Sequence, residues 1–446
     1  MSDSPIEKRP SQAPDENRRK LLRRGLMAAS VLAIGPSLWG PPAWGGSPRS
    51  ARPMGMGNRI SNIPNLADTL HEITVENDPA TRMVVPRGFS VREVARTGQR
   101  AHPGSSYRWH SEPDGGATFP MRDGGWVYVS NAEVSELRQG GVGALRFNHR
   151  AEIVSSYPIC SATTNNCAGG LTPWGTWLTC EEIDNGLVYE CDPTGEKLAV
   201  PLPALGAFKH EAAAVDPIGR CIYLTEDVED GNLYRFVPDV YSSGGRADLR
   251  NGRLEVAVVD GDNSASTRKL SWEKITNPNP RLTGDEAKRD LPTRHQVPQA
   301  AKFNGGEGAW YHDHIVYFTT KGDNRVWAVD TARDLIDLIY DKKADGVFEP
   351  GINDVDNITV SPGGDVLVAE DGADMRLVVV GGDVKPFELV NVIGQRGSEI
   401  TGPAFSPDGN RLYFSSQNGI AGDSTDGRTY EMRGPFFIDA ESVKQG

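Results

Sequence analysis

The stretch Ser361-Pro362-Gly363-Gly364-Asp365-Val366-Leu367-Val368-Ala369-Glu370-Asp371 contains the pattern that decides the fold. A turn rich in Pro, Gly and Asp leads into four apolar residues, and two acidic residues follow them. The same format recurs, with apolar segments that begin near residues 126, 176, 221, 315, 366 and 411. Most intervals between these segments are about 45–51 residues, and one is about 94. A strand-rich unit that repeats every 40–50 residues or so indicates a β-propeller.

A second apolar strand follows most of these segments, over residues 143–147, 187–192, 233–237, 325–330 and 376–380. We therefore predict an all-β fold, a six-bladed β-propeller with a long insertion near residues 240–300. That stretch is polar and rich in Asn and Pro, which is typical of an excursion from the core. A β-sandwich or barrel with irregular strand spacing is the alternative. No segment has a sustained helical period.

The composition limits the classes of function. The chain has 446 residues, of which 50 are Gly and 31 are Pro, and this abundance of turn formers excludes a helical bundle. The net charge of −13 disfavours a nucleic-acid partner. Five Cys residues are too few, and odd in number, for a disulfide scaffold.

The N-terminus has the features of an export signal. The segment Arg23-Arg24-Gly25-Leu26-Met27 follows the twin-arginine pattern, and a charge-free run over residues 28–39 comes after it. A Gly-Pro pair breaks this run, which is too short to span a bilayer. We predict a twin-arginine signal over residues 1–45 and a single propeller domain over residues 46–446. The twin-arginine translocase would be its export partner, and the mature protein would be periplasmic or secreted with no stable membrane anchor. An ordinary secretory signal or an N-terminal anchor is the alternative.

Acidic residues stand just after the same end of several predicted strands: Glu133, Glu181 and Glu182, Glu226 and Asp227, and Glu370 and Asp371. Rotational repetition would bring these acids to one face of the propeller, around its central channel. Carboxylates gathered at one place repel each other unless a cation neutralises them. We therefore expect a cation site at this mouth for the acids as a set, although each acid taken alone is more typical of a solvated turn.

Other segments place chemically active side chains among small residues: Asn166-Cys167-Ala168, Lys209-His210-Glu211, Gly306-Glu307-Gly308, Asp356-Asn357 and Ser398-Glu399. The sequence lacks a nucleophile elbow, a phosphate-binding loop, a dinucleotide fingerprint and a zincin motif. The expected site is thus rich in oxygen ligands, with one thiolate candidate. Ca²⁺ suits the oxygens, and iron accepts both carboxylate and thiolate.

Three segments resemble the PhoX-type alkaline phosphatases: Asn165 to Glu182, including Asn-Asn-Cys-Ala and Thr-Cys-Glu-Glu, then Gly206 to Ala212, and Ser398 to Gly409. The resemblance extends over roughly residues 60–436 and keeps the segments in order. It implies a six-bladed propeller that acts outside the cytoplasm as a phosphomonoesterase. It also implies Ca²⁺ and a pair of iron ions (Fe³⁺) near the channel mouth.

The same resemblance implies roles for particular residues. Cys167, Glu211 and Glu307 would be catalytic as iron-site ligands, and Glu182 would bind Ca²⁺. Weaker candidates for the same cluster are Glu133, Asp356 and Glu399.

Two departures from the family pattern affect substrate binding. The family commonly has Arg-Pro-Glu-Trp where this chain has Gly305-Gly306-Glu307-Gly308, so a phosphate-clamping Arg is missing. It also often has Asn-His-Glu where this chain has Asn131-Ala132-Glu133. Lys321 or Arg325 could supply the lost positive charge.

We therefore expect a monomeric, metal-dependent phosphatase-like hydrolase whose substrate is a small phosphate ester. One alternative is a Ca²⁺-dependent lactonase-like propeller hydrolase, which needs no thiolate. The other is a non-catalytic periplasmic propeller that binds a ligand.

Overall fold

The computed structural model describes Leu66, Leu70 and residues 74–261, 267–282, 289–343, 351–372, 374–380 and 385–436. The export signal predicted over residues 1–45 lies outside them. Nearly all of the regular structure is β-strand, and short 3-10 helices occur at Pro203–Leu205 (η3) and Thr293–His295 (η5). No helix in the described part of the chain has the length and apolar character needed to cross a membrane.

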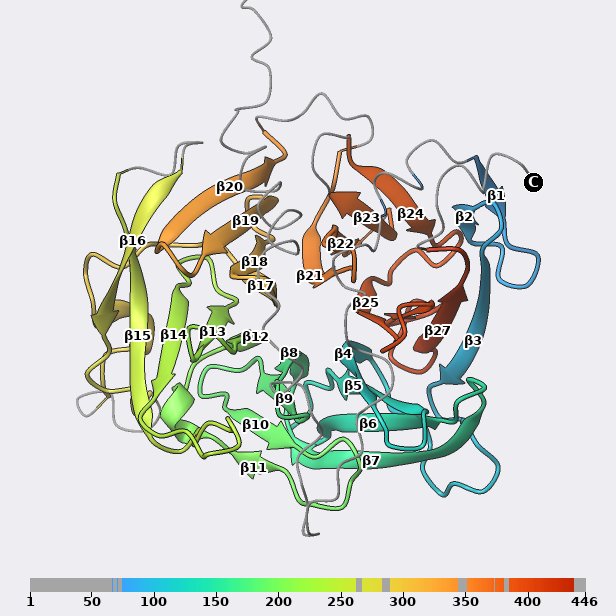
Figure 1. The fold of residues 1–446 in the computed structure, drawn as a ribbon, viewed down its shortest axis with the longest axis horizontal. Helices are drawn as coiled ribbons and strands as arrows, with labels where there is room; N and C mark the ends of the chain where they lie inside the picture. Colours follow the sequence, from blue (N-terminus) through green and yellow to red (C-terminus); the bar gives the residue numbers. More distant parts are fainter. Residues whose placement is uncertain are drawn as a thin grey trace, which may run out of the picture.

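Six antiparallel blades surround a central axis, which confirms the predicted six-bladed propeller (Figure 1). Blades 1 to 3 are β4–β7 (Pro113–Pro120, Trp126–Ala132, Gly140–Phe147, Ile153–Thr163), β8–β11 (Asn166–Leu171, Trp177–Glu181, Val188–Cys191, Val200–Pro201) and β12–β15 (His210–Asp216, Cys221–Glu226, Leu233–Pro238, Gly252–Val259). Blades 4 and 5 are β17–β20 (Gly306–His312, Ile315–Thr320, Arg325–Asp330, Leu335–Asp341) and β21–β24 (Val355–Val360, Val366–Glu370, Arg376–Val380, Phe387–Asn391). Blade 6 is β25–β27 (Ile400–Phe405, Arg411–Ser416, Arg428–Arg433) with β3 (Ser90–Arg96).

The apolar segments used to predict the repeat are the second strands of the blades: β5, β9, β13, β18, β22 and β26. Each is buried over nearly its whole length, because neighbouring strands cover both of its edges and neighbouring blades cover its faces. Such strands are continuous apolar runs rather than alternating ones. The first strands, β4, β8, β12, β17, β21 and β25, lie nearest the axis (Figure 1).

The stretch near residues 240–300 is partly built into the propeller. Its β15 completes blade 3, and β16 (Arg268–Lys274) pairs with both β15 and β20. Blades 3 and 4 consequently share one nine-stranded sheet. The helix η5 lies in the remainder of the insertion.

The ring is closed by a strand from the N-terminal part of the chain. β3 precedes blade 1 in sequence but pairs with β27, the last strand of blade 6. Strands β1 (Val75–Asn77) and β2 (Val84–Pro86) extend blade 5 at its outer edge.

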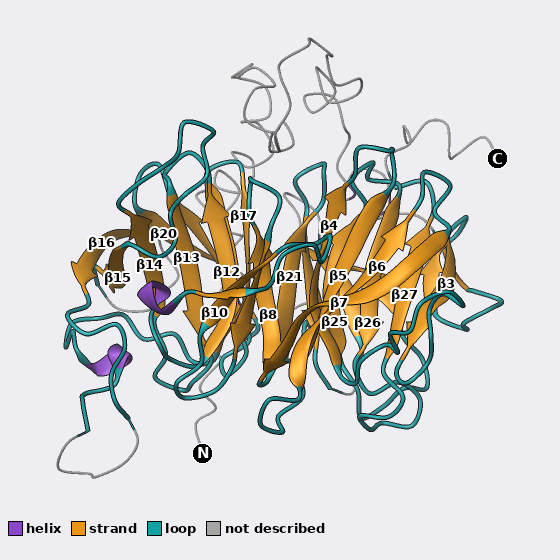
Figure 2. Cartoon of the chain, turned by 90° about the horizontal axis from the view of Figure 1, so that it is seen from below, coloured by secondary structure: helices purple, strands orange, loops and turns teal. Residues whose placement is uncertain are grey.

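The hydrophobic core is divided among the blade interfaces. Six apolar clusters occur within the described residues, and each combines side chains of adjacent blades. Figure 2 shows the blades side on, with loops gathered at the two ends of the propeller. Burial of these clusters fixes the blades against each other and so sets the spacing of the strands that surround the axis.

Candidate metal centre

Every first strand carries a β-bulge at the same level of the propeller. In each, two residues of the first strand oppose one residue of the second strand. The bulged pairs are Asp114-Gly115, Cys167-Ala168, Glu211-Ala212, Glu307-Gly308, Asp356-Asn357 and Gly402-Pro403. A bulge redirects a side chain out of the alternation of a strand. Five of the six first positions hold an acid or a thiol, and the sixth is a glycine.

The second positions of the bulges are small or compact, and they line a cavity on the axis. A Cβ added to Gly115 would lie 2.6 Å from Ala168 Cα, and one added to Gly308 would lie 2.7 Å from Ile358 N. Adjacent first strands therefore approach each other with no room for larger side chains. This close approach holds the first-position side chains near one another.

A second set of equivalent residues comes directly after the second strands. These six positions are Glu133, Glu182, Asp227, Lys321, Asp371 and Gln417. All six interact by hydrogen bond or charge with the acids of the bulges or with one another, and Glu399, before β25, joins them in blade 6. We call the bulge residues, these loop residues and Glu399 together the mouth cluster.

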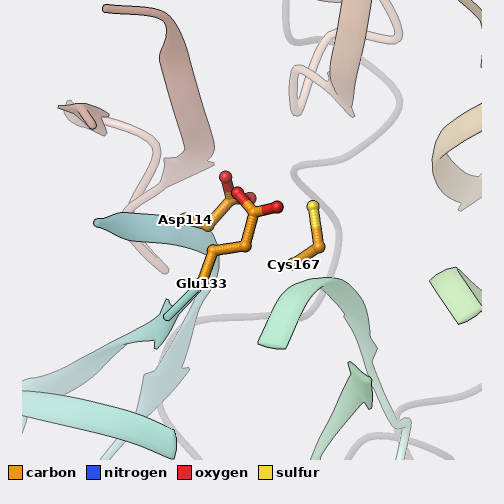
Figure 3. A group of neighbouring side chains, drawn as sticks. All are labelled: Asp114, Glu133 and Cys167. Atoms are coloured by element: carbon orange, nitrogen blue, oxygen red, sulfur yellow. The ribbon is translucent and has the colours of Figure 1, made fainter. Parts of the chain in front are cut away.

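Nine members of the mouth cluster lie close enough to share cations. Four groups have ligand atoms within 4.8 Å of one another: Asp114, Glu133 and Cys167; Cys167, Glu182 and Glu211; Glu211, Glu307 and Asp356; Asp356, Asp371 and Glu399. In the first group the two carboxylates and the thiol extend toward one another from β4, the loop after β5 and β8 (Figure 3). Successive groups share Cys167, Glu211 or Asp356, so the candidate positions form a continuous series around the mouth.

Glu211 gives the clearest sign that a cation belongs here. Its side chain is fully buried, and Oε1 accepts a hydrogen bond from Cys167 Sγ at 3.1 Å. Its Oε2 is also buried and has no hydrogen-bond partner among the described residues. A buried carboxylate oxygen without a partner is strongly unfavourable unless a cation binds it. The donor set, which combines several carboxylates with one thiol, fits a multivalent metal.

The electrostatics of the mouth cluster agree with that fit. Burial, and then repulsion by neighbouring carboxylates, raises the pKa of Asp114, Glu133, Glu211, Glu307 and Glu399 well above the ordinary range. Burial and the same acids also raise the pKa of the Cys167 thiol. These groups would ionise together only beside compensating positive charge.

Two lysines supply some of that charge. Lys209 Nζ lies 2.7 Å from Glu182 Oε1 and 2.8 Å from Asp227 Oδ2. Lys321 Nζ lies 3.1 Å from Asp356 Oδ2 and also pairs with Asp371. In the described part of the chain no other cationic side chain forms an ion pair with these acids. Two ammonium groups are too few for the eight carboxylates of the four groups.

The structure brings together all seven residues predicted as ligands: Cys167, Glu182, Glu211, Glu307, Glu133, Asp356 and Glu399. Their roles as ligands stay predictions. Asp114 was missed, although its Asp-Gly-Gly context matches the acid-and-small-residue pattern of the other bulges. Asp371 was expected only as one of the strand-end acids.

Three strand-end acids that we expected at the mouth instead form hydrogen bonds with residues outside the mouth cluster. Glu181 accepts hydrogen bonds from the backbone of Thr164 and Leu187, Glu226 from Tyr234, and Glu370 from Arg376. They are the last residues of their strands, whereas the following residue reaches the mouth, because successive residues of an extended chain point in opposite directions. Arg325 pairs with Asp323 and Asp341 rather than with the mouth cluster.

The close approach of the first strands leads to a prediction for Gly308→Ala. The added methyl would lie 2.8 Å from Asn357 Cα, so β17 and β21 must separate. We expect a loss of about 1–3 kcal/mol of stability and a lower metal content, measured by thermal unfolding and elemental analysis. Gly244→Ala is the control, because its nearest atom beyond its chain neighbours is 3.9 Å away. Unchanged stability of Gly308→Ala would contradict the packing argument.

Comparison with known proteins supports a family relation. The family model for alkaline phosphatase PhoX matches residues 139–190 and 183–337. PhoX of Pseudomonas fluorescens, solved in complex with vanadate, is similar over 84% of this chain and 98% of its own, with 15% identity and a TM-score of 0.65. A search of curated proteins found no match.

Two other solved structures are similar at a lower level. A gluconolactonase of Xanthomonas campestris matches over 84% of this chain and 95% of its own, with 12% identity and a TM-score of 0.42. The calcium-binding protein regucalcin of Agrobacterium tumefaciens matches over 76% and 93%, with 12% identity and a TM-score of 0.42. The resemblance to the PhoX-type alkaline phosphatases is confirmed by the family match together with the propeller fold.

Proposed function

We propose that this PhoX-like chain is a metal-dependent phosphatase that hydrolyses small phosphate monoesters outside the cytoplasm. The match to the PhoX family favours a phosphatase-like hydrolase. The observation that carries the proposed metal dependence is the convergence of eight carboxylates and one thiol at one mouth of the propeller. The vanadate complex belongs to the P. fluorescens protein and is relevant here only by analogy.

The proposed metal ligands are Asp114, Glu133, Cys167, Glu182, Glu211, Glu307, Asp356, Asp371 and Glu399. We assign Ca²⁺ to positions with oxygen ligands alone and Fe³⁺ to those that include Cys167, because thiolates favour transition metals. When bound, these ions would supply Lewis acidity toward the phosphoryl oxygens. Cys167, Glu211 and Glu307 would act as the catalytic ligands because they lie in the central groups.

Lys321 is the residue of this chain that we assign to substrate binding. Its side chain is about one-third exposed at the mouth, and its ammonium pairs with Asp356 and Asp371. Burial lowers the pKa of the Lys321 ammonium. The nearby carboxylates of Asp356 and Glu307 raise this pKa by more, so the ammonium stays charged. If Asp356 and Asp371 held metal ions, the Lys321 ammonium would be available to bind a phosphoryl oxygen. The Cβ of Lys321 lies 3.9 Å from where a Cβ at Gly305 would be, and Gly305 is the position of the missing Arg.

Replacing Lys321 by Ala tests this assignment. We expect KM for a phosphate monoester to rise about 10- to 150-fold, since one charged hydrogen bond contributes roughly 1.5–3 kcal/mol. Metal content should remain that of the wild type. Lys269→Ala, which removes an exposed lysine from β16, is the control. A normal KM in Lys321→Ala would show that Lys321 does not contact the substrate.

The twin-arginine pattern within residues 1–45 supports export, and we propose that residues 46–446 act as one monomeric propeller domain. The translocase would be its partner during export only.

The decisive experiment combines elemental analysis of protein purified without chelator with activity assays. Iron together with calcium, and release of phosphate from monoesters, would support the proposal. Calcium alone with lactone hydrolysis would favour the lactonase-like alternative. Ligand binding that survives removal of the metals, without any turnover, would favour a non-catalytic propeller.

A further inference from the structure

Two buried cysteines face each other between blades 1 and 2, away from the mouth cluster. Cys160 lies in β7, the outermost strand of blade 1, and Cys191 is the last residue of β10 in blade 2. Both belong to the apolar cluster shared by these blades. Each thiol acts on the pKa of the other, so the two sulfur atoms lie close together. They are 6% and 0% exposed, and neither belongs to a candidate metal group in the described part of the chain.

Independent contacts hold the two segments together. Tyr157, three residues before Cys160, donates a hydrogen bond from Oη to the carbonyl of Pro193 at 3.0 Å. A Cβ at Gly195 would lie 3.1 Å from the Tyr157 ring. The turn after β10 is therefore fastened to β7 beside the cysteines. The closeness of the two thiols follows from this packing rather than from the sulfur atoms alone.

We propose that Cys160 and Cys191 form a disulfide that fastens blade 1 to blade 2 once the protein reaches an oxidising compartment. Disulfides persist in such compartments, and the twin-arginine pattern predicts export of the chain to one. The bond is a modification separate from the metal centre. It does not depend on the phosphatase activity.

The oxidant in this proposal is a disulfide, either of a thiol oxidoreductase or of oxidised glutathione. The thiolate of Cys160 attacks it, one of its sulfur atoms leaves as a thiol, and a mixed disulfide forms. Cys191 then attacks the Cys160 sulfur and releases the second thiol. Overall the two cysteines give up two protons and two electrons, one S–S bond forms, and the S–S bond of the oxidant breaks.

Cys160 is suited to the first attack. The neighbouring Cys191 thiol lowers the pKa of the Cys160 thiol, although burial opposes this effect. Pro158, Ser161 and Ala162 around it are exposed, and among the described strands none pairs with the outer edge of β7. Local opening of this edge strand would admit the oxidant.

The bond would close a loop of the chain that contains Cys167 and Glu182 of the mouth cluster. A cross-link of this kind stabilises a protein mainly by restricting its unfolded state. We expect reduction to lower the midpoint of thermal unfolding by about 5–10 °C.

Peptide mapping tests the proposal directly. Protein exported by its own signal is alkylated under denaturing conditions without reductant and cleaved after glutamate. Because Glu152, Glu181, Glu190 and Glu196 flank the sites, Cys191 is released in the fragment 191–196 and Cys160 in the fragment 153–181. We expect these two fragments to be linked, with a mass two hydrogens below the sum of the free fragments. Fragment ions should place the link at Cys160 and show alkyl groups on Cys167 and Cys180. Cys191 that is alkylated, or linked to Cys167 or Cys180, would overturn the proposal.

Two further measurements separate the disulfide from the export route. Protein made in a reducing cytoplasm and treated with oxidised glutathione should give the same linkage, and its absence there would also overturn the proposal. The Cys160→Ser/Cys191→Ser variant should unfold at the same temperature with and without reductant in excess metal. Cys180→Ser, a buried cysteine in the same blade as Cys191, should keep the reductant sensitivity of the wild type. A double variant that still responds to reductant would place the bond elsewhere.

Discussion

Replacing Glu211 by Gln is expected to reduce phosphate release roughly 1,000-fold, because several kcal/mol of transition-state stabilisation by the metals would be lost. Glu211 belongs to two adjacent candidate groups, so a single change weakens both. The neutral amide keeps the size of the side chain but removes the charge that a cation requires. Steady-state assays and elemental analysis should show activity and metal content falling together. The fold should be kept, since Gln removes a buried carboxylate whose Oε2 has no hydrogen-bond partner in the described structure.

Glu255→Gln is the matched control for this change. Glu255 is a buried glutamate of the same blade, but it pairs with Arg235 and Arg253 on the outer strands. Its replacement should lower stability and leave metal content and turnover close to those of the wild type. Wild-type activity in Glu211→Gln would contradict the assignment of the mouth cluster as the metal centre.

The second strands were predictable from sequence, and the first strands were not. The second strands are buried on both faces, so their apolar residues form continuous segments between turn formers, as over Val366–Glu370. The first strands crowd around the axis and consist largely of small residues, such as Gly115-Gly116 and Ala212-Ala213-Ala214. Small residues carry little hydrophobic periodicity, so the spacing alone did not reveal these strands.

The candidate site shows the same division. Acids that follow an apolar segment, such as Glu182, could be placed at one mouth by rotational repetition. Asp114 stands in a first strand whose bulge depends on pairing with β5, and such pairing is a tertiary feature. The choice between Glu370, which pairs with Arg376, and Asp371, which reaches the mouth, likewise depends on strand register. The pairing of β3 with β27 joins distant parts of the chain, and no local signal marks it.

Removal of the metals is expected to reverse the pH dependence of stability as well as to abolish activity. Burial and neighbouring acids raise the pKa of Glu211, Glu307 and Glu399 in the folded chain, whereas unfolding restores ordinary values of about 4.3. Between the ordinary and the raised pKa the folded metal-free protein holds more protons than the unfolded chain. The stability that these protonated acids give the metal-free protein is therefore at its full value below the ordinary pKa. It decreases as the pH rises from the ordinary to the raised pKa. Bound cations have the opposite effect, because they select deprotonated ligands.

Thermal unfolding with and without chelator, between about pH 5 and pH 8, measures this difference. We expect the midpoint of the metal-free protein to fall by about 10 °C across this range, while that of the metal-loaded protein stays level or rises. Glu307→Gln should make the unfolding midpoint of the metal-free protein depend less on pH, because the substitution removes one buried group that must ionise. Glu255→Gln should leave this dependence unchanged, since Glu255 lies outside the mouth cluster and pairs with Arg235 and Arg253. Equal slopes with and without metal would show that the acids of the mouth cluster are not neutralised by cations, and the proposed metal dependence would then be wrong.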